Sequence, residues 1–199
     1  MGYVSRWPLF ANLIAACICL GLSATFHLWF AHSTHVGMMC AKLDYAGIII
    51  LIFGSTMPPI YYYFSCGPAI FWRNLFLTLM TVSSSVTFVV TLLPRFEKPE
   101  SRSLRGFLFI FLGACAASIM VVLYVFRDPI HIMEPDGLPY LVGALIYLFG
   151  AGFYMTRVPE RCKPGHFNII GHSHQLFHFC VLAACYLHYQ AGLDCYFRR

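Results

Sequence analysis

Long apolar runs alternate with short polar segments along the whole chain. Six of these runs approach or exceed the roughly 20 residues that a helix needs to cross a bilayer, and they are bounded by helix-ending residues such as Pro8 and Pro94. Pro58-Pro59 should kink the second helix. Because the connections are short, we predict an all-α membrane protein folded as one antiparallel bundle, a single transmembrane domain over residues 1–199. The predicted helices are 9–31, 43–65, 72–93, 106–126, 138–156 and 167–190.

The composition agrees with an integral membrane protein. Hydrophobic residues make up 59% of the chain, charged residues 11%, and the mean hydropathy is +0.71. A soluble globular domain is about 45–50% apolar and about 25% charged, so this chain has too few polar groups to cover its surface in water. The net charge of +5 indicates basic loops at one membrane face, and we expect no nucleic-acid partner.

The cysteines do not predict a metal site or a disulfide framework. No C-x-x-C pair occurs among the nine cysteines, which argues against thiolate ligands for zinc. Five of them lie within apolar runs, where a thiol behaves as a small hydrophobic side chain. These five are Cys17, Cys19, Cys115, Cys180 and Cys185.

Lysine and arginine predict the orientation in the membrane. With six spans, eight of them fall on one face: Lys42, Arg95, Lys98, Arg102, Arg105, Arg157, Arg161 and Lys163. The other face carries five: Arg6, Arg73, Arg127, Arg198 and Arg199. Positive loops stay inside, so the first face is predicted to be cytoplasmic. Both chain ends and the acidic 128–136 loop are then expected on the outer or lumenal face of a plasma membrane or endomembrane.

Ionisable side chains within membrane spans are costly and mark function by default. The spans contain five that call for an explanation: His27, Asp44, His174, His178 and His188. The fourth and fifth predicted spans contain none, and the third has only Arg73 near its outer end.

Four of these residues are predicted to meet at one depth, at the cytoplasmic ends of three helices. At a rise of 1.5 Å per residue, His27 lies about 6 Å inside the first span and His174 about 10 Å inside the sixth. His174 and His178 are four residues apart, so both rings can face one metal ion. The intervening Gln175 cannot act as a general base, so any base must come from elsewhere in the chain.

Three histidines without a cysteine form the ligand set of a catalytic zinc site, in which water takes the fourth position. We therefore predict that His27, His174 and His178 bind Zn²⁺, which would lower the pKa of the water toward about 7. Asp44 is the expected carboxylate either behind the histidine ligands or beside that water, because Zn²⁺ would neutralise its charge within the bilayer. Ser23, one turn before His27, could donate a hydrogen bond to a bound carbonyl or to the water.

Other interpretations of these polar residues stay open. Asp44 could be a helix N-cap that follows Lys42-Leu43. His188 is typical of a histidine that joins two helices by a hydrogen bond, and His172 of an interfacial residue. The remaining histidines are interpreted as loop residues: His32, His35, His131 and His166.

The ordered motifs resemble those of the progestin and adipoQ receptor family, closest to its adiponectin-receptor branch and also called hemolysin III-related. The resemblance covers the chain from about Arg6 to His188. It rests on Ser23-Ala24-Thr25-Phe26-His27, Lys42-Leu43-Asp44-Tyr45-Ala46-Gly47, Val158-Pro159-Glu160-Arg161 with Pro164-Gly165, and His172-Ser173-His174-Gln175-Leu176-Phe177-His178. It implies zinc ligation by the same three histidines and a water-mediated contact from Asp44.

Family members have seven helices, with a cytoplasmic N-terminus and an outward C-terminus, and are linked to ceramide hydrolysis and to lipid or hormone signalling. By this resemblance the chain begins at the second helix of the family fold, so we expect a fragment or truncated sequence. The implied partners are a ceramide-like or other sphingolipid substrate and an extracellular protein or steroid ligand. The sequence leaves a homo-oligomer open.

Three functions compete on these observations. The first is a zinc-dependent amide hydrolase for ceramide-like lipids, with Asp44 moving the proton. The second is a receptor whose zinc is purely structural, holding the first, second and sixth helices together. The third is a transporter or channel using the polar cluster as a relay, which is disfavoured because the polar residues gather at one face and do not continue across.

Overall fold

The computed structural model describes residues 4–64, 67, 69–125, 137–167 and 169–198. Within these ranges the secondary structure is helical, as predicted. The elements are α1 (Trp7–Trp29), α2 (Thr34–Ser55), α3 (Met57–Tyr63), α4 (Ala69–Thr91), α5 (Pro94–Glu97), the 3-10 helix η1 (Pro99–Ser101), α6 (Arg102–Val125), α8 (Leu138–Thr156) and α9 (Ser173–Phe197).

Six helical stretches of the described chain are long and apolar enough to cross a membrane, which confirms the six-span prediction. One of them, Thr34–Tyr63, combines α2 and α3. Its interruption at Thr56 comes just before Pro58 and Pro59, which occupy the first turn of α3 and lack the amide hydrogens that a continuous helix would use. The helix is therefore interrupted at the position where the kink was predicted.

Several helix boundaries were predicted wrongly. The second span begins at Thr34 instead of 43, because the Ser33 hydroxyl caps it by accepting a hydrogen bond from the Val36 amide (3.2 Å). Polar residues in its first turns hid this start from hydropathy, and Lys42, predicted in a loop, lies inside α2. The last span begins at Ser173 instead of 167 and continues to Phe197.

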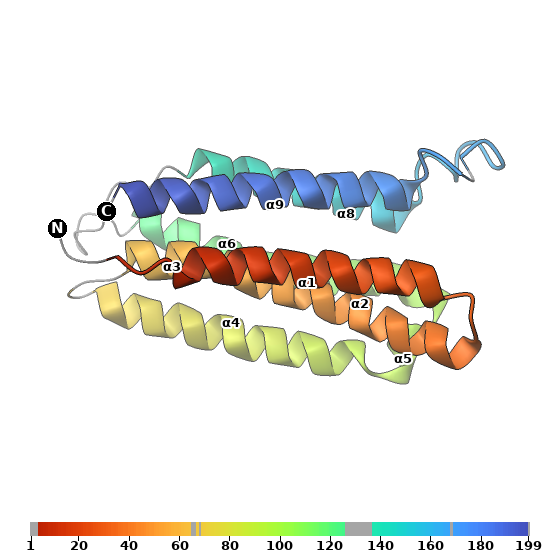
Figure 1. Ribbon diagram of the computed structural model, residues 1–199, viewed down its shortest axis with the longest axis horizontal. Helices are drawn as coiled ribbons and strands as arrows, with labels where there is room; N and C mark the ends of the chain where they lie inside the picture. The colour runs from red at the N-terminus through yellow and green to blue at the C-terminus, as the bar shows by residue number, and fades with distance from the viewer. Residues whose placement is uncertain (1–3, 65–66, 68, 126–136, 168, 199) are drawn as a thin grey trace.

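The helices run antiparallel along one long axis, and both chain ends lie at the same end of the bundle (Figure 1). The connections from α1 to α2, from α4 to α6 and from α8 to α9 lie at the opposite end (Figure 1). The pairs α1–α2 and α8–α9 form the most extensive interfaces. This arrangement brings the end of α1 and the start of α9 to the same end of the bundle.

Close helix packing and an apolar outer surface fit a lipid environment. A Cβ on Gly47 would lie 3.0 Å from the Cys19 backbone, so glycine lets α2 approach α1 closely. Fully buried side chains such as Phe64, Met80 and Leu112 form the core, while the outward positions carry large apolar residues, as expected where helices face lipid tails. The eight cysteines among the described residues are free.

Candidate metal centre

Three histidine rings converge where the end of α1 meets the start of α9. His27 Nε2 lies 3.0 Å from His174 Nε2, and His174 Nε2 lies 3.2 Å from His178 Nε2. One nitrogen of each ring lies within 4.8 Å of the other two, so the three residues could hold a metal ion. The helical spacing of four residues puts His174 and His178 on one face of α9, and that face looks toward His27.

The donor set and its spacing fit a tetrahedral zinc site. Zinc–nitrogen bonds of about 2.0–2.1 Å place neighbouring ligands at about 3.3–3.4 Å from each other in a tetrahedron. The two shortest nitrogen separations here, 3.0 and 3.2 Å, are close to that edge. Three protein ligands leave one tetrahedral position for water or substrate, which is the pattern of catalytic zinc.

The histidines lie closer to the helix ends than the sequence suggested. His27 is two residues from the end of α1, and His174 is the second residue of α9. The expected depth of about 10 Å for His174 was wrong, because residues 158–167 and 169–172 form turns, bends and loop instead of the first turns of a helix. His27 is exposed, whereas His174 and His178 are half-buried.

Ser23 and Asp44 join the histidines, as the sequence predicted. Ser23 Oγ lies 3.4 Å from His178 Nε2, and Asp44 lies close enough to Ser23 and His27 for both side chains to act on its charge. Asp44 is 8% exposed. Because α2 begins ten positions earlier, at Thr34, the alternative that Asp44 caps a helix is wrong. Asp44 falls outside the group whose ligand atoms lie within 4.8 Å of one another.

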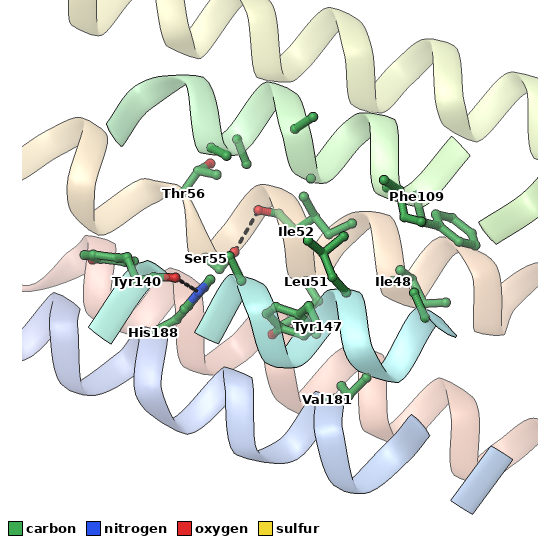
Figure 2. A pocket seen from close by; sticks show the side chains of 18 of the residues that line it. Ile48, Leu51, Ile52, Ser55, Thr56, Phe109, Tyr140, Tyr147, Val181 and His188 are labelled. Atoms are coloured by element: carbon green, nitrogen blue, oxygen red, sulfur yellow. Dashed lines mark hydrogen bonds between the residues drawn. The ribbon is translucent and has the colours of Figure 1, made fainter. Parts of the chain in front are cut away.

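A cavity of about 920 Å³ runs from this polar cluster into the bundle. It is lined by residues of α1, α2, α3, α6, α8 and α9, and Ser23, Asp44, His174 and His178 are among them. Figure 2 shows its middle, where apolar side chains such as Ile48, Leu51 and Val181 surround the space. The site therefore joins a metal-binding constellation to a space suited to a hydrocarbon chain.

Two arginines, Arg102 and Arg105, also lie at the end of the bundle that holds the histidines (Figure 1). The sequence assigned Arg102 and Arg105 to a loop and predicted a fourth span without charged residues. In the structure, both arginines lie in the first turn of α6. The guanidinium of Arg102 lies 4.3 Å from the centre of the Tyr154 ring. Arg105 is buried and donates hydrogen bonds to the carbonyl oxygens of Phe96 and Lys98. Because Arg105 belongs to a basic stretch of the sequence, its burial was not predicted.

Tyr154 links these cations to the histidines. Its ring centre lies 6.3 Å from that of His174, and it lines the cavity. The sequence did not predict that Tyr154 lies beside His174. This position depends on how α8 packs against α9.

Residues around the first turn of α9 hold that turn in place. His172, predicted as interfacial, is the N-cap, and its Nδ1 accepts from the Gln175 amide at 3.4 Å. Glu160 accepts from the amide and hydroxyl of Ser173. Desolvation pushes the pKa of the Glu160 carboxyl upward, but the hydrogen bonds from Ser173 and the charge of Arg157 outweigh it, so the pKa lies below its ordinary value of 4.5.

The other histidines divide as follows. His188 Nε2 donates to the carbonyl oxygen of Tyr140 at 3.2 Å, which confirms a bond between α9 and α8 (Figure 2). His32 and His166 lie in turns, as predicted. His35 lies in the first turn of α2 and was wrongly assigned to a loop. His131 lies outside the described residues.

Comparisons with known proteins identify the family of this chain. The family described as haemolysin-III related matches residues 2–189. The chain is 45% identical over 191 residues to heptahelical transmembrane protein 4 of Arabidopsis thaliana, covering 96% of this chain and 49% of that protein.

Animal proteins are also similar. Progestin and adipoQ receptor-like protein 1 of Caenorhabditis elegans is 39% identical over 188 residues, covering 92% of this chain and 42% of that protein. The adiponectin receptor protein of Drosophila melanogaster is 37% identical over 182 residues, covering 90% and 40% respectively. The chain thus spans about half the length, or less, of these relatives. With its helical bundle and its histidine cluster, this chain belongs to the haemolysin-III-related family of multi-pass membrane proteins, which includes the progestin and adipoQ receptors.

Proposed function

We propose that this chain carries the zinc-dependent site of an intramembrane hydrolase that cleaves the amide bond of ceramide-like lipids. The observation that carries the proposal is the meeting of three histidine nitrogens with a buried carboxylate beside a large apolar cavity. Structural zinc sites almost always have four protein ligands, and they have no need of such a cavity.

The reaction would add water across the amide bond. The oxygen of water bonds to the acyl carbon, the carbon–nitrogen bond breaks, and the nitrogen takes a proton to leave as a free amine beside a carboxylic acid. A zinc ion held by His27, His174 and His178 would supply Lewis-acid chemistry and make a water molecule more acidic.

The chain's own residues have separate tasks in this scheme. Asp44 would take the proton of the attacking water and pass it to the leaving nitrogen, as general base and then general acid. Ser23 contacts His178 and is near enough to Asp44 to act on its charge, so its hydroxyl would be placed to donate a hydrogen bond to the substrate carbonyl or to the water. The apolar side chains of the cavity would hold the acyl chain and exclude bulk water.

The proposal includes a cellular setting. The basic ends of the bundle would lie in the cytoplasm, which puts the histidine site at the inner leaflet and the C-terminus on the outer or lumenal face. Hydrolysis would be coupled to lipid or hormone signalling, with an extracellular protein or steroid as the sensed ligand. These roles follow the names of the relatives, among them an adiponectin receptor protein.

A second candidate is a receptor whose zinc only joins helices. The interface between α1 and α9 is much smaller than those of α1–α2 and α8–α9, and the three histidines join these two helices. A metal there would fasten a weakly packed pair. In that case zinc removal would lower stability, and amide hydrolysis would be absent in the intact protein.

The deciding experiment measures metal content and amide turnover on the same purified protein. We expect about one zinc per chain, release of fatty acid from a ceramide-like lipid, loss of turnover with a chelator and recovery when zinc is added back. Bound zinc with no turnover would favour the structural role. The absence of bound zinc would overturn both candidates.

A further inference from the structure

The segment between α8 and α9 contains the Val158-Pro159-Glu160-Arg161 motif, to which the proposed chemistry assigns no task. This segment ends where α9 begins, at Ser173, one residue before the ligand His174. The first amide groups of a helix have no partner within the helix, so other groups must fix the first turn. The position of His174 depends on those groups.

Glu160 binds this first turn with both carboxylate oxygens. Oε2 accepts from the Ser173 amide at 2.8 Å, and Oε1 accepts from the Ser173 hydroxyl at 2.5 Å. Ser173 is almost fully buried, with 1% of its surface exposed. Two bonds from one planar carboxylate fix both distance and direction, and a negative charge near a helix N-terminus is favourable.

The other bonds at this turn are more local. Gln175 Oε1 accepts from the Gly171 amide at 2.7 Å, and Gln175 Nε2 donates to the Ile169 carbonyl at 3.0 Å. They connect residues four and six positions apart, whereas Glu160 and Ser173 are 13 positions apart. Glu160 thus ties α9 to the start of the segment that follows α8, and Arg157 at the end of α8 is close enough to act on its charge.

We propose that Glu160 is a positioning residue for the histidine site. It holds the first turn of α9 at the place where His174, and His178 one turn later, face His27 on α1. The separations of 3.0 and 3.2 Å between their nitrogens leave little room for movement of that turn. This inference rests on the proposed metal site, which it deepens by naming what orients two of its three ligands.

The test compares zinc affinity in Glu160→Ala, Glu160→Gln and Ser173→Ala with that of the unchanged chain, by competition with a chelator. Partners that orient metal ligands typically contribute 10–100-fold to metal affinity. We expect a loss in this range for Glu160→Ala. Glu160→Gln and Ser173→Ala each leave one of the two bonds possible and should lose less. Glu100→Ala is the matched control, because Glu100 is exposed in η1, away from α9.

A cobalt spectrum separates positioning from simple stabilisation of the helix. Co²⁺ in place of zinc reports ligand geometry, and we expect altered band intensities in Glu160→Ala but not in Glu100→Ala. Unchanged affinity and an unchanged spectrum in Glu160→Gln and Ser173→Ala would overturn the inference, even if Glu160→Ala fails to fold. A chain that binds no zinc before any substitution would instead overturn the proposed function, and the inference with it.

Discussion

His27 Nε2 and His174 Nε2 lie 3.0 Å apart, although 147 positions separate the two residues in the chain. Two charged imidazolium rings at this distance would repel each other. Neutral rings, in contrast, can both direct a lone pair at one cation, and His178 Nε2 adds a third donor 3.2 Å from His174. The relationship therefore predicts metal binding more directly than any single histidine does.

The first prediction is that replacing both His174 and His178 by alanine removes the metal. Two of three ligands are lost, so a zinc content of about one per chain should fall to background. Elemental analysis of the purified variant measures it. His35→Ala provides the control, because this histidine is exposed on α2 and outside the cluster. Full zinc occupancy in the double variant would disprove the ligand assignment.

The second prediction separates Asp44 from the ligands. Asp44→Asn keeps the shape of the side chain but removes its basicity, so zinc should remain while amide hydrolysis falls about 10²-fold or more, a typical contribution of general acid–base catalysis. Zinc content and turnover are measured on one preparation. If the variant loses zinc as completely as a histidine variant, Asp44 is a direct ligand.

The third prediction concerns the cavity. Gly113 lines it, and a Cβ added there would meet no atom within 4 Å, so leucine fits the helix and fills cavity space. Gly113→Leu should reduce kcat/KM for a long-chain substrate by roughly tenfold or more, since apolar pockets discriminate at this level per group. The zinc content should stay unchanged.

Gly21→Leu is the matched control for this experiment. A Cβ there also meets no atom within 4 Å, but Gly21 is exposed on α1 and does not line the cavity. Equal losses of kcat/KM in both variants would show that the effect comes from the helices and not from the cavity.

The fourth prediction is that the stability of the protein depends on pH through the ionisation of the Glu160 carboxyl. Its pKa is depressed in the folded protein, so its contribution to the free energy of unfolding is complete above the ordinary value of 4.5 and is lost as the pH falls through the lower folded pKa. Glu160→Gln should therefore lower the melting temperature at pH 7, and the difference from the unchanged chain should shrink at lower pH.

Thermal unfolding of the metal-free protein in detergent at several pH values measures this difference. Removing the metal matters because metal binding itself depends on pH and would add its own change in stability. Arg157 and Arg102 are the cations that act on Glu160. A difference that stays constant from neutral to acidic pH would contradict the prediction.

The sequence predicted the residues that meet but not the local structure that brings them together. Apolar run length is a strong signal for a membrane helix, and the spacing of His174 and His178 is informative by itself. The starts of α2 and α9 were misplaced because they depend on caps, from Ser33 in one case and from His172 and Glu160 in the other. Such caps involve one or two hydrogen bonds, which hydropathy does not record.

Contacts between helices were equally hard to foresee. Arg105 is buried against two backbone carbonyls, and Tyr154 reaches both Arg102 and His174. Each depends on how α6 and α8 are rotated and packed, which a sequence pattern specifies only loosely. The acidic loop 128–136 lies outside the described residues, so its outer location stays a prediction.

The last prediction concerns orientation, on which the proposed side of catalysis depends. The histidine site shares its end of the bundle with the connections from α4 to α6 and from α8 to α9 (Figure 1). Single cysteines replacing Lys98 or Lys163, both exposed, in an otherwise cysteine-free chain should resist an impermeant thiol reagent on intact cells and react after permeabilisation, because basic loops stay inside. A cysteine at Ile132, in the acidic loop, should react without permeabilisation. Labelling of Lys98→Cys and Lys163→Cys from outside would move the metal centre to the outer leaflet, and labelling at all three positions would contradict the six-span arrangement.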